Sequence, residues 1–320
     1  MRREGSPWQG LGAVMLKELS DHLSSARMRV LEWLVVLTAA AALYGAIQQI
    51  KDTTAEDPFV FLRLFSVSRS PLPSFASILG FLIPLVAIGL GFDAINGEHN
   101  RRTLSRILSQ PIYRDALLLG KFLAGLVTLA VSLVCLWLLV IGLGLLLLGV
   151  PPNGEEVARS LMFLLVALAY AGVWLAVAML FSILFRSPAT AALAALGLWL
   201  FFALLWQMLA PAIAQFIAPP DLAALLLGQP GAETLAWQQG LERLSPTHLF
   251  GEAVVAMLSP MTRSLGPVFL SQLEGAVIGT PLPFAQSLLI AWPQIVGLVA
   301  AMILLFVASY VVFQRQEVRA

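Results

Sequence analysis

Six long apolar segments divide the chain. A helix rises ~1.5 Å per residue, so crossing a hydrocarbon core ~30 Å thick needs ~20 apolar residues. The segments are 33–50, 74–95, one that begins near 121 and meets no charge before Glu155, one between 159 and 186, one between 186 and 221, and 286–313. The pattern predicts an all-α membrane protein with six transmembrane helices.

Lys and Arg are distributed unequally between the loops on the two sides. The N-terminal segment, the loop between the second and third spans, Arg186 and the C-terminal tail hold thirteen of them, and the other loops hold six. Because basic residues favour the cytoplasmic side, both termini are predicted to be cytoplasmic.

Residues 1–30 precede the first span and contain apolar positions at helical spacing, namely Trp8, Leu11, Met15, Leu19 and Leu23. This spacing predicts an amphipathic helix on the cytoplasmic membrane surface. A compatible alternative is a short helix that packs on its own protein.

The loop 96–121 is the most charged part of the chain. Leu104, Ile107 and Leu108 form a small apolar ridge among charged residues, and Pro111 would end a helix there. Such a segment cannot be buried in lipid. It is either a solvated loop or a docking element for a cytoplasmic partner.

The outer loop 219–285 is too long for a simple connection. Its helical signals are the apolar run 222–227, the spacing of Trp237, Leu241 and Leu244, and a helix over 248–258 between Pro246 and Pro260. These short helices are expected to lie at the outer interface or dip into it.

Composition supports a membrane protein and excludes several other classes. Hydrophobic residues make up 59% of the chain and charged residues 12%, with a mean hydropathy of +0.87, against ~45–50% and ~25% in soluble domains. A soluble enzyme, a disordered regulator and a disulfide scaffold are excluded, the last because Cys135 is the only cysteine. The net charge of +1 gives no reason to expect a nucleic-acid partner.

The sequence offers no catalytic, cofactor or metal site. The segment 119–122 is the nearest match to a phosphate-binding loop, but it lacks Ser or Thr after Lys121, so ATP hydrolysis by this chain is not expected. His22, His99 and His248 lack zinc-ligand spacing. A membrane enzyme that acts alone is therefore disfavoured.

Ion-coupled transport is disfavoured too, since the centres of the six segments carry no ionisable group. Asp93 and Lys121 lie at the cytoplasmic ends of the second and third spans, where they could reach the headgroups or pair locally. An energised partner would explain a membrane protein with a charged cytoplasmic segment and no energy source of its own.

Residues 92–125 read FDAINGEHNRRTLSRILSQPIYRDALLLGKFLAG. The segment resembles the permease subunits of type-2 ABC transporters through Phe92, Asp93, Gly97, Glu98, Thr103, Leu104, Ser109, Pro111, Arg114, Gly120 and Lys121. It departs from the family at Arg102, where glycine is usual. Lys17-Glu18-Leu19 with Asp21 and the basic tail 313–319 also resemble the family. The local similarity is greatest to the NosY-like permeases of nitrous-oxide-reductase maturation.

The resemblance implies one permease domain over 1–320, with a surface helix in 1–30, a coupling loop at 96–121 and an extracytoplasmic loop at 219–285. A coupling helix over 98–109 would contact the ATPase through Glu98, Arg101, Arg102, Thr103, Leu104, Arg106, Ile107 and Leu108. The implied partners are a dimeric cytoplasmic ABC ATPase, which would hold ATP and Mg, and a second permease copy or paralogue. The implied activity is transport, in the export direction, across the bacterial cytoplasmic membrane.

A second hypothesis keeps the ATPase contact without transport of a small molecule. The chain would then relay ATPase motion to an extracytoplasmic partner at 219–285, as a mechanotransmission or membrane-assembly subunit. A continuous polar path would favour transport over this alternative. The few polar residues of the spans, Thr128, Ser132, Ser182, Thr190 and Gln207, suggest a hydrophobic or lipid-like cargo if one exists.

Overall fold

A computed structural model describes residues 10–52, 58–101, 113–149, 151–219, 231–265 and 280–315. Regular structure in these ranges is helical, and the one β contact among them is an isolated bridge between Arg69 and Leu72. Six helical spans are long and apolar enough to cross a membrane. They are α2 (Ala26–Lys51), Phe75–Asn100 with α4 (Phe75–Gly91) and α5 (Asn96–Asn100), α7 (Arg114–Leu148), α8 (Gly154–Leu184), Pro188–Ile217 with α9 (Pro188–Leu200) and α10 (Trp206–Ile217), and α15 (Phe284–Arg315). The prediction of an all-α protein with six spans is confirmed.

The first span begins earlier than the apolar pattern predicts. The Ser25 hydroxyl accepts a hydrogen bond from the Met28 backbone amide and caps α2, which therefore begins at Ala26 and not at Trp33. The hydrophobic pattern marks where the lipid-soluble part of a helix starts, whereas the cap decides where the helix itself starts. Glu32 consequently lies inside α2.

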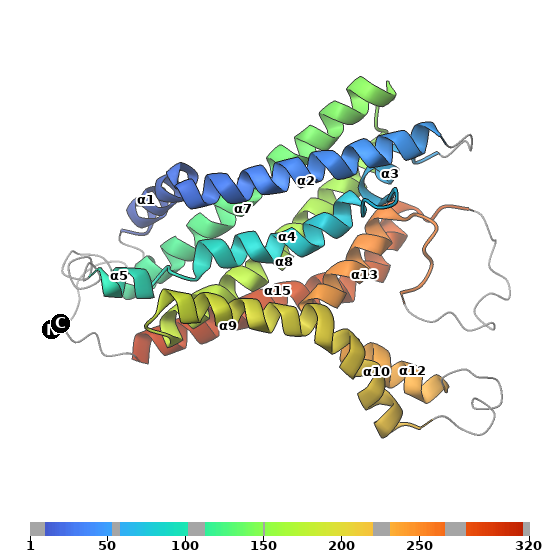
Figure 1. Cartoon of the computed structure of the whole chain (residues 1–320). Coiled ribbons are helices and arrows are strands. Elements are labelled where there is room, and N and C mark those ends of the chain that lie inside the picture. Colours follow the sequence, from blue (N-terminus) through green and yellow to red (C-terminus); the bar gives the residue numbers. More distant parts are fainter. Residues whose placement is uncertain are drawn as a thin grey trace.

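The bundle has two distinct ends (Figure 1). One end, the α5 end, holds α5, the short N-terminal helix α1 (Leu11–Ser24) and the end of α15, where Gln314 donates to the Asp115 carboxylate in the first turn of α7. The opposite end, the α13 end, holds α3 (Val60–Ser66) and α13 (Pro246–Leu258). The chain therefore begins and ends its described part on the same side of the bundle.

The α8 helix forms the centre of the bundle. It packs against α4, α7, α9, α13 and α15, and its Tyr170 and Trp174 side chains are buried. Gly91 of α4 and Gly125 of α7 approach α8 closely, because a Cβ atom on either would lie 2.8 Å from an α8 side chain. A substitution at either glycine would push its helix away from α8.

The α7–α8 hairpin is defined by its caps. Gly149 ends α7 in the left-handed conformation, with φ 71, which glycine adopts without strain. Asn153 then starts α8 in a capping box with Glu156, whose carboxylate also accepts from the Phe61 backbone amide of α3. The α8 helix therefore starts several residues before Arg159, which the pattern had placed at its boundary.

The fifth span is interrupted. A π-helical turn, η1 (Phe201–Leu205), separates α9 from α10, and Pro211 lies inside α10. Both features bend helices, and Figure 1 shows α10 turning away from the bundle beside α12 (Ala232–Glu242). The Trp206 indole donates to the Leu241 carbonyl at 2.8 Å and joins α10 to α12.

The helices predicted in the long loop are partly confirmed. α13 spans the expected residues, begins with Ser245 as cap and Pro246 in its first turn, and ends two residues before Pro260. Trp237 and Leu241 lie in α12, whereas Leu244 follows it, and the run 222–227 lies outside the described residues. One face of α13 is buried against α8 and α15, so this helix packs into the bundle.

Candidate functional site

The structure describes two of the eight predicted coupling residues. Glu98 lies in α5, and Arg101 caps the C-terminal end of that helix. The other six, Arg102, Thr103, Leu104, Arg106, Ile107 and Leu108, lie outside the described residues. Their contacts with an ATPase therefore stay predictions.

A buried ammonium group joins the two ends of the 96–121 loop. The Lys121 side chain is 4% exposed, and its Nζ lies 3.4 Å from Oε1 of Glu98. The same Nζ lies 2.8 Å from Oε1 of Glu18 in α1. One lysine of α7 thus holds α1 and α5 together, through partners far away in sequence.

Lys17 extends this network at the solvent side. Its Nζ is 2.9 Å from both the Glu18 and the Asp21 carboxylates, and 3.9 Å from Glu98. Burial alone would lower the pKa of Lys17, but hydrogen bonds to Glu18 and Asp21 outweigh it, and the pKa is raised. Burial would raise the pKa of Glu18, but the charges and hydrogen bonds of Lys121 and Lys17 hold it below its usual value. The Glu18 carboxylate and the Lys17 ammonium group are therefore kept charged.

A second ion pair joins α2 to the turn after α4. The Arg27 guanidinium binds both carboxylate oxygens of Asp93, at 2.9 and 3.2 Å, and lies 4.9 Å from the centre of the Phe92 ring. A bidentate pair of this kind fixes orientation as well as distance. Phe92 and Asp93 begin the segment that resembles the permeases.

The start of α5 is fixed to the end of α8. The Ser182 hydroxyl accepts from the backbone amides of Ile95 and Asn96, at 3.0 and 3.2 Å. Asn96 donates to the Phe185 carbonyl, and Asn100 donates to the Arg186 carbonyl. A movement of α5 would therefore act directly on α8.

The ion pairs of Lys121, Lys17 and Arg27 surround a cavity of about 400 Å³ at the α5 end, lined by four basic and four acidic side chains among others. The charged residues are Lys17, Arg27, Arg101, Lys121, Glu18, Asp21, Asp93 and Glu98. His22 also lines it, and burial lowers the pKa of its imidazole. The described residues contain no cluster of His, Cys, Asp and Glu suited to a metal ion. The ion pairs around this cavity tie α1 to α5 and α7, and α2 to the turn after α4.

The family model described as ABC-2 family transporter protein matches residues 12–318. The chain belongs to the ABC-2 family. This membership confirms the resemblance to type-2 ABC permeases.

Two curated relatives of this ABC-2 chain are probable ABC transporter permease proteins NosY. The protein of Stutzerimonas stutzeri is 32% identical over 148 residues, which cover 46% of this chain and 48% of the relative. The protein of Pseudomonas aeruginosa is 41% identical over 68 residues, 21% of this chain and 25% of the relative. The matched segment is thus about half or less of the length of either relative.

The geometry explains why Gly120, an uncharged residue of the ABC-2 resemblance, is a glycine. A Cβ atom on Gly120 would lie 2.9 Å from Cγ1 of Val14 and 3.4 Å from the Leu11 carbonyl oxygen. Glycine here lets α1 lie directly on α7, which brings Glu18 within reach of Lys121. The buried face of α1 is thus centred on Val14 and Glu18, while Leu16 and Leu23 are exposed.

The sequence identifies the charged residues at the α5 end of this ABC-2 chain, but it does not identify their interaction partners. Lys121 and Asp93 were expected to reach headgroups or pair locally, and both form ion pairs with residues distant in sequence. Ser182 was noted only as a polar residue of a span, and its role as acceptor for α5 had no sequence signal. The Lys17-Glu18 motif was the available signal for the α1 contact.

Proposed function

We propose that this ABC-2 permease turns the motion of a separate dimeric ATPase into export of a hydrophobic cargo across the bacterial cytoplasmic membrane. ATP and Mg belong to the ATPase, and a second permease copy or paralogue completes the path. The observation that carries the proposal is the Lys121 contact with Glu98 and Glu18, because it ties both ends of the coupling loop to α1. Within this proposal the α5 end is cytoplasmic.

The coupling step would pass through α8. When the ATPase subunits close, the loop between α5 and α7 would be displaced, and the bonds from α5 to Ser182 would move the end of α8. The α8 helix has 31 residues and is about 46 Å long, so it spans the bilayer as one unit. Displacement at one end would thus reach the other.

The mechanotransmission alternative has an observation in its favour at the α13 end. Arg159 of α8 is fully buried and donates to the Met257 carbonyl, the Leu282 carbonyl and the Ser287 hydroxyl. These bonds join the outer segment firmly to the helix that α5 contacts. Under this alternative α13 and its neighbours would pull on an extracytoplasmic partner, and no molecule would cross.

Copurification tests the shared step of both hypotheses. The chain should bind a soluble ABC ATPase, stimulate its hydrolysis of ATP, and hydrolyse none when purified alone. Leu104→Ala with Leu108→Ala should abolish copurification, because each leucine at the centre of an interface contributes ~1–3 kcal/mol. Arg106→Ala should only weaken it, as a charge at the rim does.

The two hypotheses differ in what crosses the membrane. Reconstituted vesicles that hold the permease and ATPase should accumulate or release a hydrophobic cargo only when ATP is hydrolysed. Normal ATPase binding and stimulation by the double leucine variant would reject the coupling mechanism. If the permease stimulates ATP hydrolysis but the interface between the two permease copies is apolar and closed, the result would favour mechanotransmission.

A further inference from the structure

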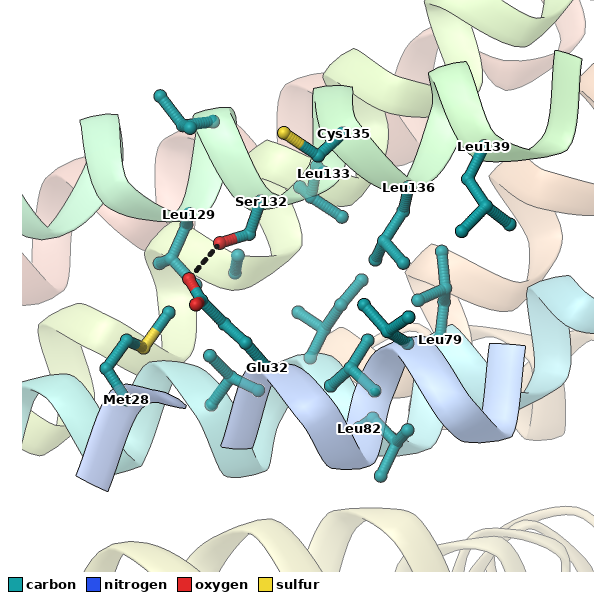
Figure 2. A pocket seen from close by; sticks show the side chains of 16 residues that line it. Met28, Glu32, Leu79, Leu82, Leu129, Ser132, Leu133, Cys135, Leu136 and Leu139 are labelled. Atoms are coloured by element: carbon teal, nitrogen blue, oxygen red, sulfur yellow. Dashed lines mark hydrogen bonds between the residues drawn. The ribbon is translucent and has the colours of Figure 1, made fainter. Parts of the chain in front are cut away.

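A cavity of about 250 Å³ lies among α2, α4 and α7, with Ala171 of α8 at its base. Figure 2 shows leucine side chains from several helices turned toward its interior. Val131 and Cys135 of α7 line it and are exposed, so the cavity opens to the outside of the bundle. It is separate from the charged cavity at the α5 end, with which it shares no lining residue.

One carboxylate lies at one end of this apolar space. Glu32 is the seventh residue of α2, about 9 Å from the start of the helix. Its Oε1 accepts a hydrogen bond from the Ser132 hydroxyl at 3.2 Å, drawn as a dashed line in Figure 2. No Lys, Arg or His lines the cavity, and within the described part of the chain Glu32 forms no ion pair.

A carboxylate beside apolar side chains is unfavourable unless a counter-charge and donors satisfy it. The Ser132 hydroxyl supplies one donor and no charge. An ammonium group would supply both, and an aliphatic chain would fill the space among the leucines, since dry apolar cavities bind apolar molecules.

The same features select against a phospholipid. Its phosphate would find no basic side chain in the lining, and it would lie beside the Glu32 carboxylate. The volume of about 250 Å³ is also below the ~300–1,000 Å³ typical of sites for drug-sized ligands. The occupant is therefore small and carries a positive charge without a negative one.

We propose that this cavity binds a lipophilic amine that enters from the bilayer, with its chain among the leucines and its ammonium group on the Glu32 carboxylate. The site does not depend on the proposed transport function. It would be present in the permease alone, with or without an ATPase.

Cys135 provides the test, because it is the only cysteine of the chain and lines the cavity. The purified chain in phosphatidylcholine nanodiscs is alkylated with N-ethylmaleimide while dodecylamine is titrated. Dodecylamine should slow alkylation of Cys135 in a saturable way. Glu32→Gln should raise the concentration for half-protection about tenfold or more, because it removes the charge-assisted hydrogen bond to the ammonium group. Glu233→Gln, which alters an exposed carboxylate on α12, should leave it unchanged.

Dodecanol is the matched neutral probe and should protect weakly, to the same degree in the wild type and in Glu32→Gln. Equal protection by both probes, or no effect of Glu32→Gln, would overturn the proposal. Cys135 could also be alkylated more slowly in phosphatidylethanolamine nanodiscs than in phosphatidylcholine nanodiscs when no amine is added. This result would assign the site to a membrane lipid and would overturn the proposal too. Leu139→Cys in a Cys135→Ser chain gives a second reporter in the same cavity. Absence of protection at both thiols would reject the site.

Discussion

The Nζ atom of Lys121 lies 2.8 Å from Oε1 of Glu18, although the two residues are 103 positions apart in the sequence. Glu98 approaches the same ammonium group at 3.4 Å. Because the lysine is buried and shared by two carboxylates, any displacement of α5 changes the charge balance around α1 and α7.

Lys121→Met should destabilise the protein, because it removes the buried cation between Glu18 and Glu98 and leaves them only the more exposed Lys17 as counter-charge. Loss of one partner from a buried pair costs about 3 kcal/mol or more, so thermal unfolding in detergent should begin at a lower temperature. The triple variant with Glu18→Gln and Glu98→Gln should regain most of the stability, and under the proposed function it should still stimulate the ATPase poorly. A Lys121→Met chain as stable as the wild type would contradict this account.

Gly120→Ala should loosen α1 from α7. The added methyl group would lie 2.9 Å from Cγ1 of Val14, and the backbone carbonyl of Leu11 leaves little room to shift. Hydrogen exchange of the amides in 11–24 should accelerate, and Val14→Ala in the same chain should restore much of the protection. Gly142→Ala is the matched control on α7, since nothing lies within 4 Å of a Cβ there. Similar exchange in both glycine variants would show that the close contact is unimportant.

The sequence predicts the spans of this protein better than the contacts between them. Hydrophobic runs locate six helices because a bilayer demands length and apolarity, and Pro246 and Pro260 bracket α13 for local backbone reasons. The partners of Lys121 and Arg159 depend on which helices are neighbours, and a pattern along one chain does not contain that information. Glu32 lies just before the apolar segment 33–50 and yet inside α2, because hydropathy does not detect the Ser25 cap.

Glu252 should make the α13 end sensitive to acid. Burial would raise the pKa of this carboxyl, but hydrogen bonds from His248, Arg243 and Gln294 outweigh burial and lower it from 4.5 to about 2. A depressed pKa stabilises the fold above pH 4.5, and that contribution is lost as the pH falls from 4.5 toward 2. Unfolding temperature should fall over this interval, and Glu252→Gln should reduce the slope. Glu233→Gln should keep the wild-type slope, and equal slopes in all three chains would refute the assignment.

Cysteine accessibility should distinguish the two sides of the membrane. In a Cys135→Ser chain, Ser105→Cys should react with an impermeant maleimide only from the cytoplasm, and Gln239→Cys only from outside. The expectation follows from the excess of Lys and Arg in the loops assigned to the cytoplasm. Reaction of both from one side would reject the proposed orientation.

Arg159→Met should loosen α13 and the start of α15 from α8 while leaving the α5 end intact. The buried guanidinium bonds to the Met257 and Leu282 carbonyls and to the Ser287 hydroxyl, and methionine fills similar space without a donor. Hydrogen exchange should therefore accelerate in α13 and at the start of α15, with no change in 11–24. Arg159→Lys should give an intermediate result, because an ammonium group keeps the charge and loses the planar fork of donors. Arg263→Met tests a more exposed arginine of the same segment, which bonds to Thr280, and should have a smaller effect. If α13 exchanges at the wild-type rate in Arg159→Met, α13 is held by its apolar face alone, and the proposed relay through this arginine is rejected.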